Sequence, residues 1–210
     1  MSFVSKIWGF LRRPATTFGA VKEETLRAAL KYALICLVIF GALTGIMLAL
    51  LGSDELSGLE LGGRAVKLLL IAGSIGLSIA GGMILIFIGG SWTHLWVKLL
   101  GGRKGCSYRQ TLKALAYGAT PAYLVGWVPL VMWSGDGLIG ATVLIGALIS
   151  IWALVVTIIG LRELHGITTG RAVLVSLLGI VITGLVILLV AVVGAVLLVI
   201  EAFFWFWGGG

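Results

Sequence analysis

Five stretches without a charged residue constrain this chain more than any other feature of its sequence. They run over residues 32–51, 68–97, 114–133, 138–161 and 172–200, and none contains Asp, Glu, Lys or Arg. About 20 apolar residues in a helix cross the hydrocarbon layer of a bilayer, which is ~30 Å thick. Each stretch is therefore long enough to span a membrane once. The second and fifth are longer than needed, so we expect them to tilt or to project into the interface.

The composition excludes a soluble fold. Hydrophobic residues make up 60% of the 210 residues and charged residues only 11%, against roughly 25% charged in an average globular protein. Backbone N–H and C=O groups in lipid must bond within their own segment, and the stretches lack the alternation of barrel strands. We therefore predict an all-α integral membrane protein with five transmembrane helices, which form a single domain over residues 1–210.

The positions of the bases predict the orientation of the chain. Thirteen of the fifteen Lys and Arg residues lie in three segments that five spans would place on one side, 1–31, 98–113 and 162–171. Cytoplasmic loops are enriched in Lys and Arg, so we expect a cytoplasmic N-terminus, an external C-terminus and residence in the cell membrane. We also expect these bases to face anionic lipid headgroups. Their scatter over three segments argues against nucleic-acid binding.

The first residues predict a short amphipathic helix that precedes the spans. One arc of its helical wheel holds Phe3, Val4, Ile7, Trp8, Phe10 and Leu11, and the other holds Ser2, Ser5, Lys6, Gly9, Arg12 and Arg13. Pro14 is expected to end this helix, because proline disfavours the helical conformation at the residue before it. A helix with these two faces suits the headgroup boundary. The alternative is an irregular start that packs on the other helices.

Three groups of residues on the predicted cytoplasmic side resemble those of Yip-domain proteins. The first comprises Phe10-Leu11-Arg12-Arg13-Pro14 and Thr17-Phe18. The second comprises Thr93-His94-Leu95, Leu99-Leu100-Gly101-Gly102, Gln110-Thr111-Leu112, Ala116-Tyr117 and Thr120-Pro121. The third runs from Ile159 to Gly166 and continues as Thr168-Thr169-Gly170-Arg171-Ala172. Each string is short, but their order and spacing together indicate the family, and the chain is similar to its shorter, prokaryotic-type members.

The resemblance implies a non-enzymatic membrane protein. Eukaryotic Yip proteins bind Rab-type GTPases and take part in vesicle formation between endoplasmic reticulum and Golgi. For this chain the resemblance favours a membrane organiser or adaptor that acts in trafficking or recruits a cytoplasmic protein partner. The candidate interaction face consists of Pro14, Phe18, His94, Gly101, Gly102, Tyr117, Pro121, Arg162, Glu163, His165 and Arg171.

Chemical sites find little support in the sequence. His94, His165, Glu163 and Cys106 share the predicted cytoplasmic side, but their spacing matches no metal motif. The plainer interpretation assigns hydrogen bonds to the histidines and an ion pair or helix end to Arg162 and Glu163. A serine hydrolase would need a Gly-x-Ser-x-Gly nucleophile elbow, and an intramembrane aspartyl protease would need paired carboxylates within the spans; the sequence has neither. We expect no catalytic residue, metal or cofactor.

A small-molecule or ion transporter or channel is the alternative function. Coupled carriers usually place an ionisable residue inside the membrane, and the five stretches contain no carboxylate or base. In favour of transport, Pro121 and Pro129 interrupt the third stretch, and broken helices can line a pathway.

Small residues spaced four apart predict close helix packing. They comprise Gly41 and Gly45 on the first span and Gly118, Ala122 and Gly126 on the third; on the second span Gly76 belongs to the series Ala72, Gly76 and Ala80, and Gly82 to the series Ser74, Ser78 and Gly82. Such residues let helix backbones approach closely in lipid. The spacing is compatible with a tight bundle within one chain and with a surface that forms a homo-oligomer.

Overall fold

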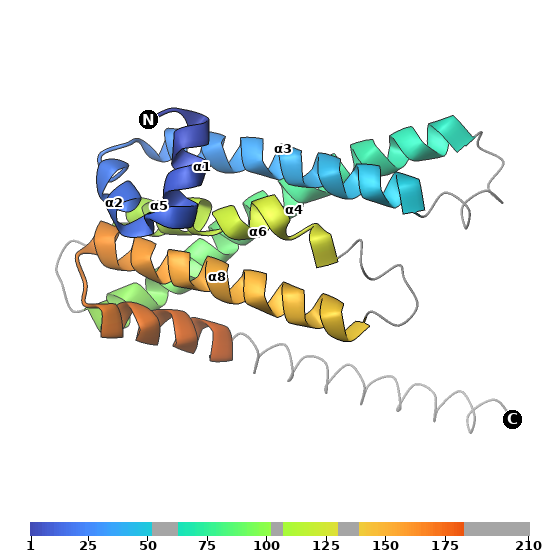
Figure 1. Cartoon of the computed structure of the whole chain (residues 1–210). Coiled ribbons are helices and arrows are strands. Elements are labelled where there is room, and N and C mark those ends of the chain that lie inside the picture. The colour runs from blue at the N-terminus through green and yellow to red at the C-terminus, as the bar shows by residue number, and fades with distance from the viewer. Residues whose placement is uncertain (52–62, 102–106, 130–138, 183–210) are drawn as a thin grey trace, which may run out of the picture.

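The computed structural model describes residues 1–51, 63–101, 107–129 and 139–182, and these residues form helices without any strand. The helices are α1 (Phe3–Arg12), α2 (Pro14–Ala20), α3 (Leu26–Leu51), α4 (Gly63–Gly101), α5 (Tyr108–Gly118), α6 (Thr120–Val125), α8 (Ile139–His165) and the segment Thr169–Ile182. In Figure 1 the axes of α3 and α8 are roughly parallel, α4 runs obliquely to both, and α1 lies across the bundle near the end at which α3 begins.

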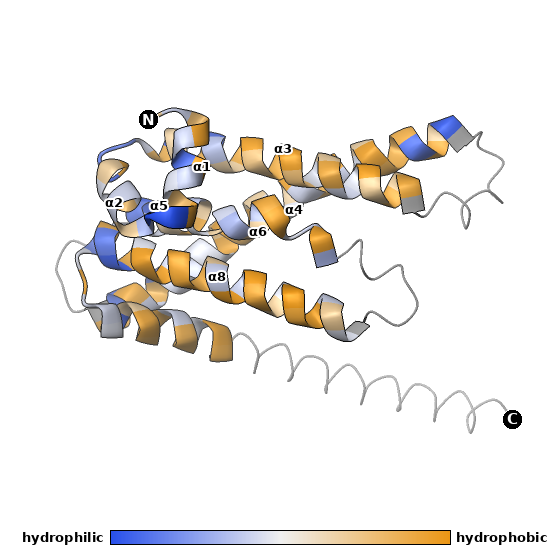
Figure 2. Cartoon of the chain, viewed as in Figure 1, coloured by the Kyte–Doolittle hydropathy of each residue, from blue (hydrophilic) through white to orange (hydrophobic). Residues whose placement is uncertain are grey.

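Three of the described helices are long and apolar enough to cross a membrane. They are Leu26–Leu50, Arg64–Leu100 and Gly140–His165, and they contain most or all of the predicted first, second and fourth spans. Figure 2 shows apolar residues along most of their length. The predicted fifth span, 172–200, is described only in its first part, because residues 183–200 lie outside the described residues. The number of five spans therefore stays a prediction.

The longest helix, α4, exposes apolar side chains along its length. Leu77 is 76% exposed and Leu85 is 71% exposed, and Leu68 and Ile88 are similar. A water-soluble protein rarely exposes so extended an apolar surface, whereas lipid tails cover it without cost. The candidate span of 37 residues is about 55 Å long at 1.5 Å per residue. It must therefore tilt or project beyond the hydrocarbon layer.

The predicted third span is divided between α5 and α6 at Ala119. Pro121 lies in the first turn of α6, and its missing N–H leaves the carbonyl of Tyr117, four residues earlier, without its usual donor. The hydroxyl of Thr120 donates to this carbonyl instead. The hydroxyl of Tyr32 lies 3.0 Å from the same Thr120 oxygen. The break is therefore hydrogen-bonded within the bundle, and Pro121 interrupts the helix as its position predicts.

Glycines let α3 approach the backbone of α4. A Cβ atom at Gly41 would lie 2.7 Å from the Cα of Ile75, and one at Gly45 would lie 2.6 Å from the Cα of Ile71. The Cβ positions of Gly82 and Gly118 are similarly close to Leu37 and to Thr157, respectively. The Cβ position of Gly126 meets the carbonyl of Ala122, in the turn before it, and the ring of Phe40. Gly76 differs, because no atom of the described residues outside its own stretch of helix lies within 4 Å of its Cβ position. Packing within the chain thus accounts for Gly41 and Gly45 but not for Gly76.

Candidate functional site at the basic end of the bundle

Hydrophilic residues gather at one end of the bundle, which we call the basic end. It consists of residues 1–31, 98–101, 107–113 and 162–171. Figure 2 shows this end on the side of α1 and α2, with a second hydrophilic group at the first turns of α4 at the opposite end. The basic end contains the first turns of α3 and α5 and the last turns of α4 and α8. Three distant parts of the sequence therefore meet there.

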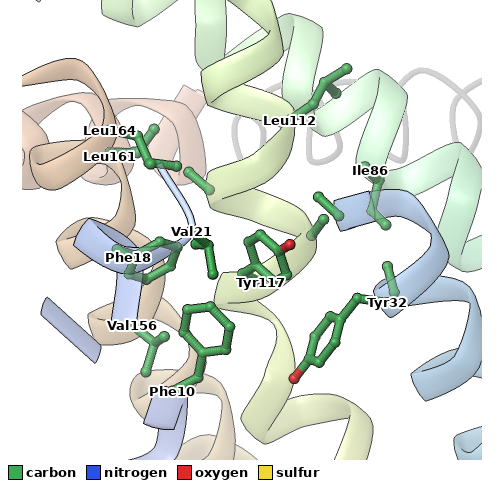
Figure 3. Packing of buried hydrophobic residues seen from close by; sticks show 14 of the residues in the cluster. Phe10, Phe18, Val21, Tyr32, Ile86, Leu112, Tyr117, Val156, Leu161 and Leu164 are labelled. Carbon is green, nitrogen blue, oxygen red and sulfur yellow. The ribbon is translucent and has the colours of Figure 1, made fainter. Parts of the chain in front are cut away.

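Four aromatic rings form the core of the basic end (Figure 3). They belong to Phe10 of α1, Phe18 of α2, Tyr32 of α3 and Tyr117 of α5. The rings of Phe10 and Tyr117 stack with centroids 4.8 Å apart, and those of Phe10 and Phe18 meet at the same separation. Each such pair contributes about 0.5–1.5 kcal/mol beyond its buried area. The helix α1 is therefore packed on the bundle through Phe10, whatever its outer face contacts.

A glycine brings α2 onto α8. A Cβ atom at Gly160 would lie 2.6 Å from the Cζ of Phe18, so a larger residue at position 160 would displace the ring. Phe18 is fully buried. This contact joins the first of the three sequence groups to the third.

The carboxylate of Glu24 links α1 to α5. Its Oε2 lies 2.6 Å from the Nζ of Lys6 and accepts a hydrogen bond of 2.6 Å from the hydroxyl of Tyr117. Burial acts to raise the pKa of Glu24, but the hydrogen bonds from Lys6 and Tyr117 outweigh it and hold the pKa below its ordinary value. The helical wheel placed Lys6 on the outward polar arc. The structure corrects this assignment: Lys6 is only 8% exposed, because its partner lies inside the bundle.

Lys113 of α5 hydrogen-bonds to the connection between α2 and α3. Its ammonium group donates to the carbonyl of Lys22 over 2.6 Å and to the carbonyl of Glu24 over 2.9 Å. The residue is 3% exposed. Burial lowers the pKa of Lys113, and the nearby carboxylates of Glu23 and Glu24 offset part of this effect. Lys113 thus acts as a buried donor to backbone carbonyls.

The two histidines share one threonine. The Nδ1 of His94 and the Nε2 of His165 each lie 2.9 Å from the Oγ1 of Thr111, which is fully buried. A hydroxyl carries a single proton, so Thr111 can donate to at most one of the two rings, and the tautomer of each ring sets the direction of its hydrogen bond. The ring of Tyr108 lies 5.4 Å from that of His94. This chain of hydrogen bonds connects α4, α5 and α8 and joins the second sequence group to the third.

The carboxylate of Glu163 forms an ion pair with Arg162. The Nε of Arg162 lies 3.0 Å from the Oε1 of Glu163, which agrees with the ion pair that the sequence suggests. Cys106 lies outside the described residues. Within the described ranges, no three His, Cys, Asp or Glu side chains come together as a metal site.

The residues chosen for the candidate interaction face occupy different depths. Buried positions hold Phe18, His94, Tyr117 and Pro121, and half-buried positions hold Pro14, Arg162, Glu163 and His165. Arg171 is exposed in the first turn of Thr169–Ile182, Gly101 ends α4, and Gly102 lies outside the described residues. The sequence groups therefore supply mainly the framework of the basic end. The sequence patterns did not identify Glu24 or Lys113 as important residues. An acid within a strongly basic segment is a signal that could have indicated a buried ion pair at Glu24.

Comparison with known proteins identifies one family. The Yip1 domain family matches residues 8–192 of the chain. This match covers all three sequence groups and confirms the resemblance drawn from them. No curated protein and no solved structure was found to match the chain.

Proposed function

The chain belongs to the Yip1 domain family, and from this premise we propose that it is a non-enzymatic membrane organiser or adaptor that recruits partners at its basic end. The family and the long apolar helices make it a multi-pass integral membrane protein. Its proposed location is the cell membrane, with the basic end in the cytoplasm, as the excess of bases there favours. Its proposed setting is membrane trafficking or the recruitment of a cytoplasmic protein.

The observation that carries the proposal is the convergence of the three sequence groups. Buried aromatic contacts and the shared threonine hold these groups together. Around this framework Arg13, Lys98 and Arg109 are exposed. A fixed surface with exposed bases at the edge of a bilayer suits the capture of an acidic partner, because complementary charge speeds encounter and selects partners.

Transport is the second candidate, since the third predicted span is broken. The side chains at the break are buried, namely Tyr117, Thr120 and Pro121, and Thr120 hydrogen-bonds back to the preceding turn. Because buried side chains fill the break, it bends the helix without opening a transport pathway. This favours the adaptor function over transport. Purified protein in liposomes separates the two candidates, because saturable, protein-dependent solute flux would replace the adaptor.

Recovery of a partner by the protein in lipid nanodiscs tests the adaptor directly. Arg109→Glu reverses an exposed charge at the basic end and should lower recovery of the partner about tenfold, which corresponds to ~1.4 kcal/mol. Arg64→Glu makes the same change at the opposite end and should leave recovery unchanged. If the two variants behave alike, or if nothing is recovered beyond empty nanodiscs, the basic end is not a recruiting surface.

A further inference from the structure

An open groove runs along the first turns of α3. It has a volume of about 820 Å³ and lies between α3 and Met83 of α4. Leu30 and Leu34 form its apolar wall, and Arg27 and Lys31 lie on its lining one helical turn apart. A smaller groove of about 340 Å³ lies between α1 and α3 and also includes Lys31. Lys31 therefore lines both grooves.

Among the described residues, Arg27 and Lys31 have no partner that would neutralise their charges. Arg27 and Lys31 are exposed, and within the part of the chain that the structure describes neither makes an ion pair or a side-chain hydrogen bond. Like charges four residues apart on a helix repel each other and destabilise it. Two other bases of this end are paired, because Lys6 contacts Glu24 and Lys113 donates to backbone carbonyls. The grooves thus combine unpaired positive charge with apolar walls.

The depth of the grooves matches the boundary between headgroups and acyl chains. Lys31 is the last base before the charge-free stretch that begins at Tyr32, and the candidate span begins at Leu26. Lys and Arg near the end of a membrane helix extend toward the headgroups. Leu34 and Met83 lie further from the headgroups, where acyl chains are found. A free anion would match the bases but would leave the apolar walls without a partner.

From this arrangement we infer that the grooves bind one anionic glycerophospholipid of the surrounding leaflet. Its phosphate lies at Arg27 and Lys31, and one acyl chain occupies the larger groove along Leu30, Leu34 and Met83. The second chain occupies the smaller groove beside α1, since the two grooves meet at Lys31. The inference rests on the membrane location in the proposed function and is independent of partner recruitment. A bound lipid at this position would brace α1 against α3.

Spin-labelled lipids measure this binding in nanodiscs of phosphatidylcholine. Labelled phosphatidylglycerol and labelled phosphatidylcholine are compared by the fraction that the protein immobilises. The wild type should prefer phosphatidylglycerol. The double variant Arg27→Gln/Lys31→Gln should lower that preference about fivefold for each base removed. This is the contribution of one Lys or Arg near an anionic surface to the affinity at low salt. The double variant Arg13→Gln with Lys22→Gln is the matched control, because it removes two exposed bases of the same end outside both grooves, and it should keep the preference.

Two further variants keep the result interpretable. Arg27→Lys with Lys31→Arg retains both charges and should restore the preference, which separates loss of charge from loss of fold. Met83→Trp fills the larger groove and should lower immobilisation of both lipids while the charges remain. Inorganic phosphate in excess should not displace the labelled lipid.

Three results would overturn the inference. They are equal immobilisation of the two lipids by the wild type, an unchanged preference in the Arg27/Lys31 double-glutamine variant, and displacement by inorganic phosphate, which would indicate a simple anion site. Loss of the lipid preference alongside intact partner recovery would remove this inference alone. Intact lipid preference without partner recovery would remove the adaptor function alone.

Discussion

At the scale of single residues, removal of the Tyr117 hydroxyl tests how much its hydrogen bond to Glu24 contributes to the stability of the basic end. The hydroxyl donates a hydrogen bond of 2.6 Å to Glu24, while the ring stacks on Phe10. Tyr117→Phe keeps the ring and leaves a carboxylate with one donor fewer. We expect the free energy of unfolding to fall by about 1.5–3 kcal/mol, the usual range for a hydrogen bond to a charged group. Unfolding in detergent, followed by circular dichroism, measures the change.

Tyr108→Phe is the matched control for this variant. The hydroxyl of Tyr108 hydrogen-bonds with Ser91 and with the carbonyl of Phe87, and both contacts are exposed. Both of these partners are neutral, and a hydrogen bond between neutral groups contributes only about 0.5–1.5 kcal/mol, so this variant should cost less than Tyr117→Phe. Equal losses would show that Glu24 does not depend on the hydroxyl of Tyr117.

Glu24 also makes the stability of the protein depend on pH. Its pKa lies below the ordinary value of 4.5, so folding favours the ionised carboxylate. The resulting stabilisation is complete above about pH 4.5 and is lost as the pH falls through the lower pKa of the folded state. Glu24→Gln removes this contribution, and its midpoint of thermal unfolding should approach that of the wild type below pH 4.5. A difference that stays constant from neutral to acidic pH would contradict the assignment.

The residue pairs of the basic end were beyond prediction from sequence patterns. Lys6 and Glu24 are 18 residues apart, and Tyr117 and Glu24 are 93 apart. A helical wheel assigns the faces of one helix without knowing which helix lies against it. It therefore grouped Lys6 with Arg12 on the outward arc. The histidines, in contrast, have hydrogen bonds of the kind that their position predicts, although their shared partner Thr111 was not identifiable.

At the scale of helices, two glycines with opposite surroundings test the packing of α3 on α4. A Cβ atom at Gly41 would lie 2.7 Å from the Cα of Ile75, while Gly76 has open space. Gly41→Ala should therefore destabilise the bundle by about 1–3 kcal/mol, because the backbones must separate. Gly76→Ala should be neutral or slightly stabilising, since alanine favours the helix. Thermal unfolding of the two variants decides this, and equal effects would contradict the close approach.

The position of α1 in the bilayer gives a second prediction at this scale. Its buried side holds Lys6 and Phe10, and Val4 is 72% exposed beside the exposed Ser5. The Arg12 guanidinium lies 4.0 Å from the centre of the exposed Trp8 ring. We expect Val4 to face the acyl boundary and Ser5 to face water.

Spin labels at positions 4 and 5 measure this difference. Collision with oxygen should dominate at position 4 and collision with a water-soluble nickel chelate at position 5, in nanodiscs with anionic lipid. Trp8→Glu should weaken the contrast without changing the three described long helices. Two labels in the same wet environment would show that α1 packs on the bundle away from the lipid.

Helix positions were more predictable than helix contacts. Long charge-free stretches identify α3, α4 and α8, because length and hydropathy are local properties of the sequence. Pro121 marks the break in the third stretch for the same reason. The helix α2 was not predicted, since Pro14 was interpreted only as the end of α1. Proline also suits the first turn of a helix, and Pro14 begins α2.

At the scale of the whole molecule, the placement of bases predicts how the protein lies in the membrane. Thirteen of fifteen Lys and Arg residues belong to segments of the predicted cytoplasmic side. In the described residues these segments meet at one end of the bundle, and the first turns of α4, which contain Arg64 and Lys67, lie at the other (Figure 2). Transfer of a charged segment across a bilayer is costly, so we expect the basic end to stay in the cytoplasm. Single cysteines in a background of Cys36→Ala and Cys106→Ser can report the side.

A membrane-impermeant maleimide added outside intact cells should label Ser53→Cys and Ser134→Cys and should miss Ser107→Cys. Ser107 is an exposed residue just before α5, whereas positions 53 and 134 lie outside the described residues in loops of the predicted external side. Opening the membrane should make Ser107→Cys reactive, which shows that the position is shielded only by the bilayer. The reverse labelling pattern would show that the protein has the opposite orientation, with its basic end outside the cell. Equal labelling of all three in intact cells would indicate insertion in both orientations, which an excess of bases this one-sided opposes.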